Sequence, residues 1–232
     1  MRVEVIIAAG GVGRRFAKDQ PKQFCLLKGK PILSWSISRF EECPLVGGII
    51  LVVPRGMERY TRQSVLSPCN YQKVKTVVKG GKERRDSVMQ GLNMLETDTD
   101  TVLVHDGVRP IISQELIIKV IQATERWEAV VPGLPVREMV KRVGRDNLVK
   151  ETLDRKKIYL IQTPQGFKKD IICQAYGQAR KRGWQANDDA SLVERLGTIV
   201  KMIPGEETNV KITSPQDLMM TELLLGAESK ES

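Results

Sequence analysis

The sequence is poor in the residue types that build most metal centres and nucleophilic triads. Its 232 residues contain one histidine, His105, and four cysteines that form no CxxC pair. One histidine excludes a multi-histidine metal site, and a Ser-His-Asp triad would have to use that residue. The cysteine spacing fits neither a zinc ribbon nor a redox motif. We expect free thiols in a reducing compartment, and therefore a cytoplasmic protein.

Long apolar runs are also missing from the sequence. No run approaches the roughly 20 apolar residues that cross a bilayer as a helix. The apolar start at residues 3–9 leads directly into glycines and arginines, which is unlike a signal peptide. We therefore expect no membrane partner.

The charge is one-sided, and aromatic residues are scarce. The chain has 37 Lys and Arg against 28 Asp and Glu, a net charge of +9. A basic surface attracts nucleic acid, phosphorylated metabolites or acidic lipid, although a merely solvated basic surface accounts for the charge equally well. A nucleic-acid-binding module is the main alternative to an enzyme. Because aromatics make up only 5% of the chain and base stacking needs them, we expect no nucleic-acid partner.

Short β-rich runs alternate with longer amphipathic stretches along the chain. This pattern is typical of an α/β fold with a mostly parallel twisted sheet and helices on both faces. It predicts one domain over residues 1–225 and a flexible tail over 226–232. The expected strands are 3–8, 49–53, 74–78, 101–105, 129–131, 158–161 and 199–203. The expected helices are 32–40, 85–95, 115–126, 171–182 and 190–196, followed by one that Ser214 caps and Pro215 begins.

One segment, at about 135–155, departs from this alternation. Two β-runs at 136–143 and 148–153 flank a turn at 144–147. The segment carries too many basic residues for a central strand, so the pattern predicts a β-arm that projects from the sheet. Because such arms often exchange between subunits, we infer a homodimer joined through the arm.

A glycine-rich turn after the first expected strand is the strongest local feature. Glycines let the backbone approach a ligand closely and point N–H groups at an anion. The turn is neither a GxGxxG fingerprint nor a P-loop, since the third glycine and the Gly-Lys-Ser/Thr sequence are absent. Arg14 and Arg15, followed by Lys22, indicate direct charge on phosphates instead. A tight turn beside a solvated basic loop is the alternative.

Further segments suit a nucleotide site. Residues 80–88 form a second glycine turn, where Ser87 and the backbone can read the edge of a small planar base. Asp106 ends an expected strand at the sheet edge where open α/β sheets bind ligands, and it is an oxygen ligand suited to Mg²⁺. Arg109 can hold an anionic substrate. We interpret His105 as a local hydrogen-bonding residue and Asp189 as a helix cap.

Four more polar segments follow, at 152–155, 162–167, 187–194 and 209–213. Taken together and in this order, all these segments resemble the 2-C-methyl-D-erythritol 4-phosphate cytidylyltransferase family. The resemblance extends from Ile6 to about Leu224. It implies a Rossmann-like nucleotidyltransferase fold and a homodimer joined through the β-arm. It also implies Mg²⁺-dependent transfer of CMP from CTP to 2-C-methyl-D-erythritol 4-phosphate, in non-mevalonate isoprenoid synthesis.

The resemblance also implies roles for single residues. Arg15, Lys22 and Lys211 match the catalytic cations around the CTP phosphates. The matching nucleotide-binding positions are Ala8, Ala9, Gly10, Gly11, Gly13, Gly81, Lys82, Ser87 and Asp106, and Asp106 is also the metal ligand. The matching substrate-binding positions are Arg109, Arg155, Thr163, Asn187 and Lys211, with Arg155 reaching in from the partner's arm.

The expected chemistry needs no general base. A sugar phosphate is largely dianionic at about pH 7 and can attack the α-phosphorus of CTP in line, so the protein supplies positioning and charge neutralisation. The chain has Glu138-Met139 where the family usually has Asp-Thr, and methionine cannot hydrogen-bond a hydroxyl as threonine does. Ribitol 5-phosphate is therefore an alternative acceptor. A sugar-1-phosphate nucleotidyltransferase that uses UTP or dTTP fits the Ser87 segment less well.

Overall fold

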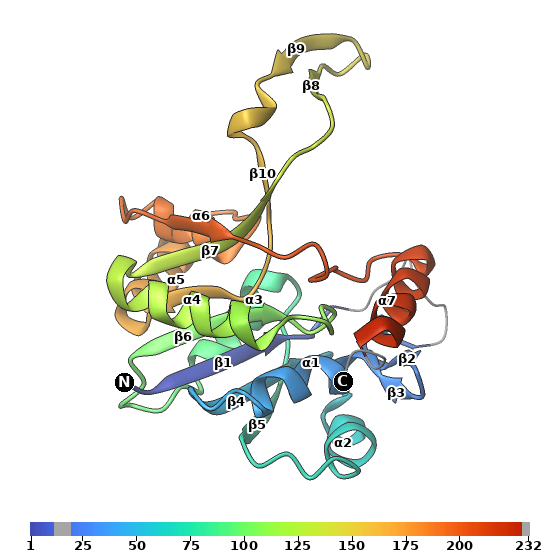
Figure 1. The fold of residues 1–232 in the computed structure, drawn as a ribbon. Helices are drawn as coiled ribbons and strands as arrows, with labels where there is room; N and C mark the ends of the chain where they lie inside the picture. The colour runs from blue at the N-terminus through green and yellow to red at the C-terminus, as the bar shows by residue number, and fades with distance from the viewer. Residues whose placement is uncertain (12–19, 229–232) are drawn as a thin grey trace.

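The computed structural model describes residues 1–11 and 20–228, which are built around a mixed sheet of eight strands (Figure 1). Seven strands follow the order β10-β7-β11-β6-β1-β4-β5, and β12 pairs with β7 outside this path. The strands are β1 (Val3–Ala8), β4 (Val46–Val53), β5 (Val74–Lys79), β6 (Thr101–Asp106), β7 (Ala129–Pro135), β10 (Tyr159–Ile161), β11 (Gln165–Lys168) and β12 (Lys201–Pro204).

Strands β6, β1, β4 and β5 form a parallel core with β1 in its interior. Ile6 of β1 lies beside Ile50 of β4 and Val104 of β6. Strands covered on both faces read as nearly continuous apolar runs, as β1 does. The same register places Ala8 beside Asp106, so the chain leaves β1 and β6 at one edge of the sheet. This edge carries the candidate site.

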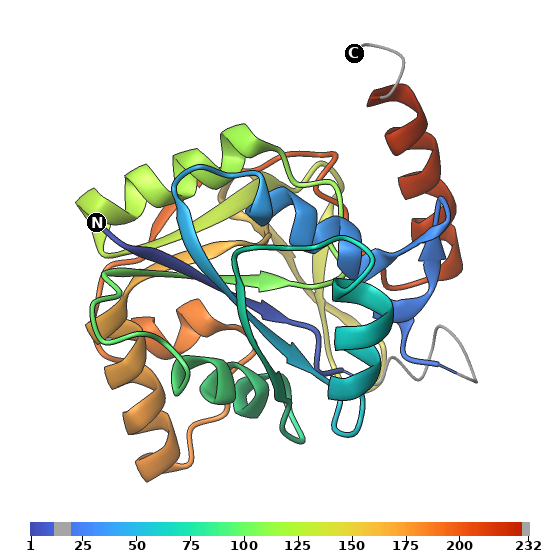
Figure 2. The same ribbon diagram turned by 90° about the horizontal axis from the view of Figure 1, so that it is seen from below.

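Helices cover both faces of the sheet (Figure 2). They are α1 (Ile32–Glu41), α2 (Glu58–Tyr60) with its π-helical continuation Thr61–Leu66, α3 (Arg84–Leu92), α4 (Gln114–Trp127), α5 (Lys169–Arg182), α6 (Asp189–Glu194) and α7 (Pro215–Glu228). Helices α1 and α4 pack with Val5 and Ile7 of β1, whereas α3, α5 and α6 pack with Ile6 on the other face. This follows from the alternation of side chains along a strand. Within the described residues, no helix combines the length and apolar character needed to cross a membrane.

The sheet is mixed, because β10 and β11 run antiparallel to their neighbours. Strand β11, which lies between β6 and β7, was not predicted from the sequence. Its sequence Gln-Gly-Phe-Lys has one large apolar residue, Phe167, and shows no alternation. The small hairpin of β2 (Leu26–Leu27) and β3 (Lys30–Pro31) was not predicted either, because two-residue strands are too short to show a period.

A β-arm stands where the sequence analysis expected it. Strands β8 (Val140–Val143) and β9 (Val149–Leu153) form an antiparallel hairpin that pairs Val140 with Leu153. Figure 1 shows this hairpin projecting beyond β7 and β10, away from the body of the sheet. Few of its side chains are covered by the rest of the chain.

The last helix corrects the expected start of the tail. Ser214 precedes α7, and its Oγ accepts a hydrogen bond from the backbone N–H of Asp217, as expected for a cap (3.3 Å). The helix continues to Glu228, however, past the expected tail boundary at Gly226. Leu225 explains the extra length, because it is buried in a cluster with Leu27 of β2 and keeps the last turns of α7 packed.

We predict that the same substitution at two helical glycines has opposite effects on the free energy of unfolding. A Cβ atom at Gly91 of α3 would lie 2.5 Å from Cγ2 of Ile6, whereas one at Gly177 of α5 meets nothing within 4 Å. Gly91→Ala is expected to lower the free energy of unfolding, because overpacking costs about 1–3 kcal/mol. Gly177→Ala is expected to raise it by about 0.5–1 kcal/mol through helix propensity. Urea unfolding of both variants measures this, and stabilisation by both would contradict tight packing of α3 on β1.

Candidate active site

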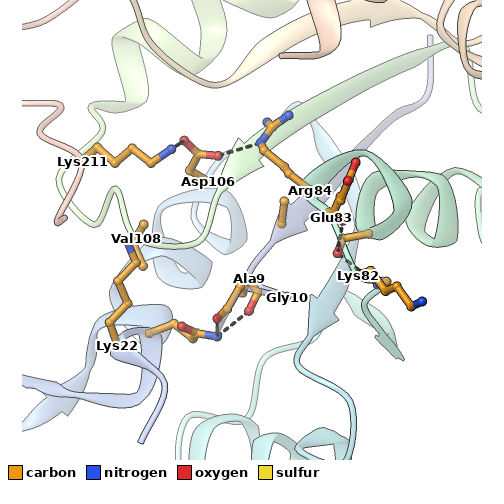
Figure 3. Close-up of a pocket in the computed structure, with 14 residues that line it drawn as sticks. Ala9, Gly10, Lys22, Lys82, Glu83, Arg84, Asp106, Val108 and Lys211 are labelled. Carbon is orange, nitrogen blue, oxygen red and sulfur yellow. Dashed lines mark hydrogen bonds and ion pairs between the residues drawn. The ribbon is translucent and has the colours of Figure 1, made fainter. Parts of the chain in front are cut away.

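A cavity opens at the sheet edge where β1 and β6 end (Figure 3). Two glycine turns form its floor, one after β1 and one between β5 and α3. A Cβ atom at Gly10 would lie 2.7 Å from Oγ of Ser87, and one at Gly80 would lie 3.1 Å from Cα of Gly10. Only glycine permits this close approach of the two turns.

Side-chain hydrogen bonds fix both turns. The buried amide of Gln23 donates to the carbonyls of Ala9 (2.5 Å) and Gly11 (2.9 Å). The Ser87 hydroxyl accepts from the N–H of Gly81 (3.1 Å) and donates to the carbonyl of Glu83 (3.1 Å). Gln23 was missed as a site residue, although its place next to Lys22 in the same motif was a signal.

Asp106, the last residue of β6, is the charge centre of the cavity. Its Oδ2 atom lies 2.8 Å from Nζ of Lys211 and 3.6 Å from Nε of Arg109. Its Oδ1 atom lies 3.3 Å from Nε of Arg84 (Figure 3). Lys22 lines the same cavity and donates to the carbonyl of Ile212 (2.8 Å). Because Ile212 follows Lys211 in the chain, this bond holds Lys22 and Lys211 on the same side of the cavity.

The surrounding cations keep Asp106 ionised. Burial by itself raises the pKa of the Asp106 carboxyl. The charges of Arg84, Lys211 and Arg109 together outweigh burial and hold this pKa well below its usual range. The cavity thus presents the ionised Asp106 among several cations, which suits a polyphosphate bound with a divalent cation.

His105 has no free ring nitrogen to transfer a proton. A carbonyl can only accept, so Nε2 of His105 carries the ring hydrogen and donates it to the carbonyl of Arg109 (3.2 Å). Its Nδ1 atom therefore accepts from the Thr163 hydroxyl (3.1 Å), whose oxygen accepts from the N–H of Asp106 (3.0 Å). Burial lowers the pKa of His105 to about 4, so the ring is neutral at physiological pH. This agrees with the interpretation of His105 as a local hydrogen-bonding residue.

The sequence analysis did not assign Arg84, and it interpreted Asp189 as a helix cap. The cap of α6 is Asp188, whose Oδ1 accepts from the N–H of Ser191 (3.0 Å). Asp189 is fully buried, and its Oδ2 atom lies 2.8 Å from Nη2 of Arg84. Both acids stand next to each other before an apolar helix, so the local pattern could not show which one caps it.

Most residues that the resemblance assigned lie at this cavity. It is lined by Ala8, Ala9, Gly10, Gly11, Lys22, Gly81, Lys82, Ser87, Asp106 and Lys211, among others. Arg109 and Thr163 contact Asp106. Gly13 and Arg15 lie outside the described residues.

Two assigned residues do not line this cavity. Arg155 lies in the 3₁₀ turn Arg155–Lys157 at the base of the arm, where it is exposed and donates to the carbonyl of Arg137 (2.5 Å). Asn187 is exposed just before α6 and borders a smaller hollow with Arg84 and Asp189.

The sequence and the fold together decide the family. A family model described as 2-C-methyl-D-erythritol 4-phosphate cytidylyltransferase matches residues 3–227. The chain belongs to this family. It is thus a nucleotidyltransferase of the non-mevalonate isoprenoid pathway, which confirms the predicted enzyme class.

Relatives and solved structures are similar to this chain in sequence and fold over nearly their whole length. The 2-C-methyl-D-erythritol 4-phosphate cytidylyltransferase of Syntrophus aciditrophicus (strain SB) is 41% identical over 227 residues, which cover 98% of this chain and 97% of the relative. The crystal structure of 4-diphosphocytidyl-2C-methyl-D-erythritol synthase from Anaerococcus prevotii DSM 20548 matches with a TM-score of 0.86 at 30% identity, covering 97% of this chain and 96% of that one. The crystal structure of the cytidylyltransferase from Thermus thermophilus matches with a TM-score of 0.79 at 34% identity, covering 97% and 98%. These matches confirm the predicted fold.

Because His105 is buried, we predict that the free energy of unfolding falls in mild acid. Burial lowers its pKa to about 4 in the folded chain, against about 6.5 when unfolded. Between these values the unfolded state binds the extra proton, so the free energy of unfolding drops as the pH falls from about 6.5 to about 4. The drop due to this residue is about 3 kcal/mol. Urea unfolding across this range is expected to show it.

The matched variant is His105→Asn. Asparagine keeps an acceptor for Thr163 but has no group that titrates in this range. Its free energy of unfolding is expected to be lower at neutral pH and to change less between about pH 6.5 and 4. An equal slope in both proteins would assign the acid sensitivity to other groups.

Proposed function

We propose that this chain transfers CMP from CTP to 2-C-methyl-D-erythritol 4-phosphate, giving 4-diphosphocytidyl-2-C-methyl-D-erythritol and pyrophosphate. Family membership supports the reaction. The observation that carries the assignment to this cavity is the ionised Asp106, surrounded by Arg84, Arg109 and Lys211 beside two glycine turns.

The acceptor phosphate attacks the α-phosphorus of CTP in line, and pyrophosphate leaves. A dianionic phosphate needs no base, which fits a site whose one histidine is neutral and fully engaged. Lys22, together with Arg15, stabilises the charge that develops toward the leaving group. Lys211 brings the acceptor phosphate and the α-phosphate together.

A divalent cation fits this site only together with the nucleotide. Among the described residues, no group of three or more His, Cys, Asp or Glu side chains is placed to hold a metal ion. Mg²⁺ commonly binds through one or two carboxylates plus substrate phosphates, and Asp106 supplies one. Asp106 would hold Mg²⁺, which supplies neutralisation of the triphosphate charge.

The two substrates occupy different parts of the site. The turns with Ala8, Ala9, Gly10, Gly11 and Gly13 hold the triphosphate, and Gly81, Lys82 and Ser87 form the cytosine and ribose pocket. The polyol phosphate lies toward Arg109, Thr163, Asn187 and Lys211. In support, Arg109 and Lys211 both approach Oδ2 of Asp106, so their charges converge where the two phosphates must meet.

The enzyme works as a homodimer in which Arg155 enters the partner's site. The arm and the adjoining β10 expose large apolar side chains, among them Leu148 (68%), Val149 (61%) and Leu160 (62%). Such a surface favours burial against a second subunit. The four free cysteines are consistent with work in the reducing cytoplasm.

The reaction is tested by pyrophosphate release in the presence of Mg²⁺. Release is expected from CTP with 2-C-methyl-D-erythritol 4-phosphate, and not with UTP or ATP. Ribitol 5-phosphate is assayed beside it, because Met139 stands exposed on the arm where the family usually has threonine. Release with ribitol 5-phosphate alone would move the enzyme to that acceptor, and no release with either acceptor would contradict the proposed function.

Lys211 and Arg155 provide a test of the shared site. Lys211→Ala is expected to lower kcat by roughly 10²–10³-fold, because it removes a cation aimed at the reacting phosphates. The control is Lys201→Ala, which removes a lysine that stacks on Trp127 away from the cavity. Mixing Lys211→Ala with Arg155→Ala subunits is expected to restore up to about a quarter of the wild-type activity, since half the dimers then hold one intact site. No recovery in the mixture would place Arg155 in its own subunit's site or outside any site.

A further inference from the structure

Arg84 is bound by two buried carboxylates, of which Asp106 lines the cavity and Asp189 lies outside it. Its Nε atom lies 3.3 Å from Oδ1 of Asp106, at the end of β6. Its Nη2 atom lies 2.8 Å from Oδ2 of Asp189, at the start of α6. Burial alone lowers the pKa of Arg84, but the two carboxylates together raise it, so the guanidinium is permanently charged. Arg84 therefore links the nucleotide turn to the loop that carries Asn187.

Asp189 also has a partner on α5. It is fully buried, and its Oδ1 atom accepts a hydrogen bond from the hydroxyl of Tyr176 on α5 (2.5 Å). Tyr176 is only 1% exposed, and burial followed by the charge of Asp189 raises its pKa well above the usual value. The phenol thus stays protonated and remains a donor. A buried carboxylate needs such partners, and Asp189 has a hydrogen bond from Tyr176 on Oδ1 and an ion pair with Arg84 on Oδ2.

We propose that Asp189 and Tyr176 are positioning residues that hold Arg84 beside Asp106 and divide its charge between two carboxylates. The inference rests on the proposed function, because Asp106 is taken as the residue that would hold the divalent cation of the nucleotide. Asp189 and Tyr176 contact neither substrate and act through Arg84.

The division of charge matters for nucleotide binding. To hold a divalent cation, Asp106 must give up part of its contacts with Arg84, Arg109 and Lys211. Lys211 can leave, since its side chain is 40% exposed, whereas Arg84 is anchored on its far side by Asp189. Without Asp189, the whole guanidinium is available to Asp106 and competes with the divalent cation for it. The anchor therefore keeps Arg84 in place without letting it block the carboxylate.

The first test is Asp189→Asn, followed by CTP binding in isothermal calorimetry over a series of Mg²⁺ concentrations. Asparagine keeps an acceptor for Tyr176 but removes the charge that holds Arg84. At low Mg²⁺ we expect CTP affinity to fall by about 10–100-fold, the range typical of groups that orient a metal ligand. Raising Mg²⁺ is expected to recover part of the loss. The KM for the polyol phosphate should stay within about twofold of wild type.

The second test is Tyr176→Phe, matched with Tyr71→Phe. Tyr71 also has an engaged hydroxyl, which donates to the carbonyl of Ser34 (2.9 Å), but it does not line the cavity. Tyr176→Phe loses the hydrogen bond to Asp189, and Tyr71→Phe loses those with Ser34 and Ser38, so both variants are expected to lose stability in urea unfolding. Only Tyr176→Phe is expected to weaken CTP binding, by about 3–10-fold, with the same split between the two KM values.

The outcomes separate the proposal from a purely structural role and from the reaction itself. If Tyr176→Phe and Tyr71→Phe bind CTP equally well, Tyr176 only stabilises the fold and the proposal is wrong. Equal losses for both substrates would also overturn it. If Asp189→Asn does not fold, the tyrosine pair decides. If wild-type protein binds CTP with Mg²⁺ but forms no product, the acceptor assignment fails, whereas the binding measurements still decide the proposal.

Discussion

A buried carboxylate cannot stay charged without cations, and Asp106 draws its cations from three segments of the chain, two of which are far from it in sequence. Arg84 comes from the first turn of α3, Arg109 from the loop after β6, and Lys211 from the segment before α7. Removing a charge from water costs several kcal/mol unless partners offset it, so these segments must meet at the end of β6 for the site to exist. The glycine turn beside Ala8 completes the cavity because β1 pairs with β6 in register.

This charge arrangement explains why so few reactive residues suffice. A phosphate acceptor brings its own nucleophile, and the leaving pyrophosphate needs neutralisation rather than a proton. The enzyme therefore supplies cations at fixed positions and a backbone cradle, both of which are difficult to hold in an unfolded loop and readily held at a rigid sheet edge. His105 illustrates this point: it stands next to Asp106 in the chain, yet it serves to fix Thr163 and the carbonyl of Arg109.

The antiparallel strands connect the site to the arm. Strand β7 leads out of the sheet into the arm, and the chain returns through β10 and β11. Thr163 lies between these two strands, where its hydroxyl reaches the backbone of Asp106. The base of the arm is thus close in sequence to a residue that contacts the backbone of Asp106. In the proposed dimer, this connection joins one subunit's site to the arm that enters the other.

Features that depend on local pattern could be predicted from the sequence. Apolar runs predicted β1 and β6, glycine spacing predicted the turn that needs close backbone approach, and an acid at a strand end predicted Asp106. The polar arm could also be predicted, because its many charged residues excluded a central strand. The resemblance assigned most of the residues that line the cavity, because they belong to contiguous motifs.

Contacts between residues far apart in the chain could be seen only in the folded protein. The four residues of β11 carry too little pattern to reveal that they enter the sheet between β6 and β7. Asp188 and Asp189 are chemically identical neighbours, and only the packing of α6 on α5 turns one into a cap and the other into the partner of Arg84. Pairing between positions 84, 106 and 189 depends on strand order and helix packing, which are set by the whole core and not by any local period.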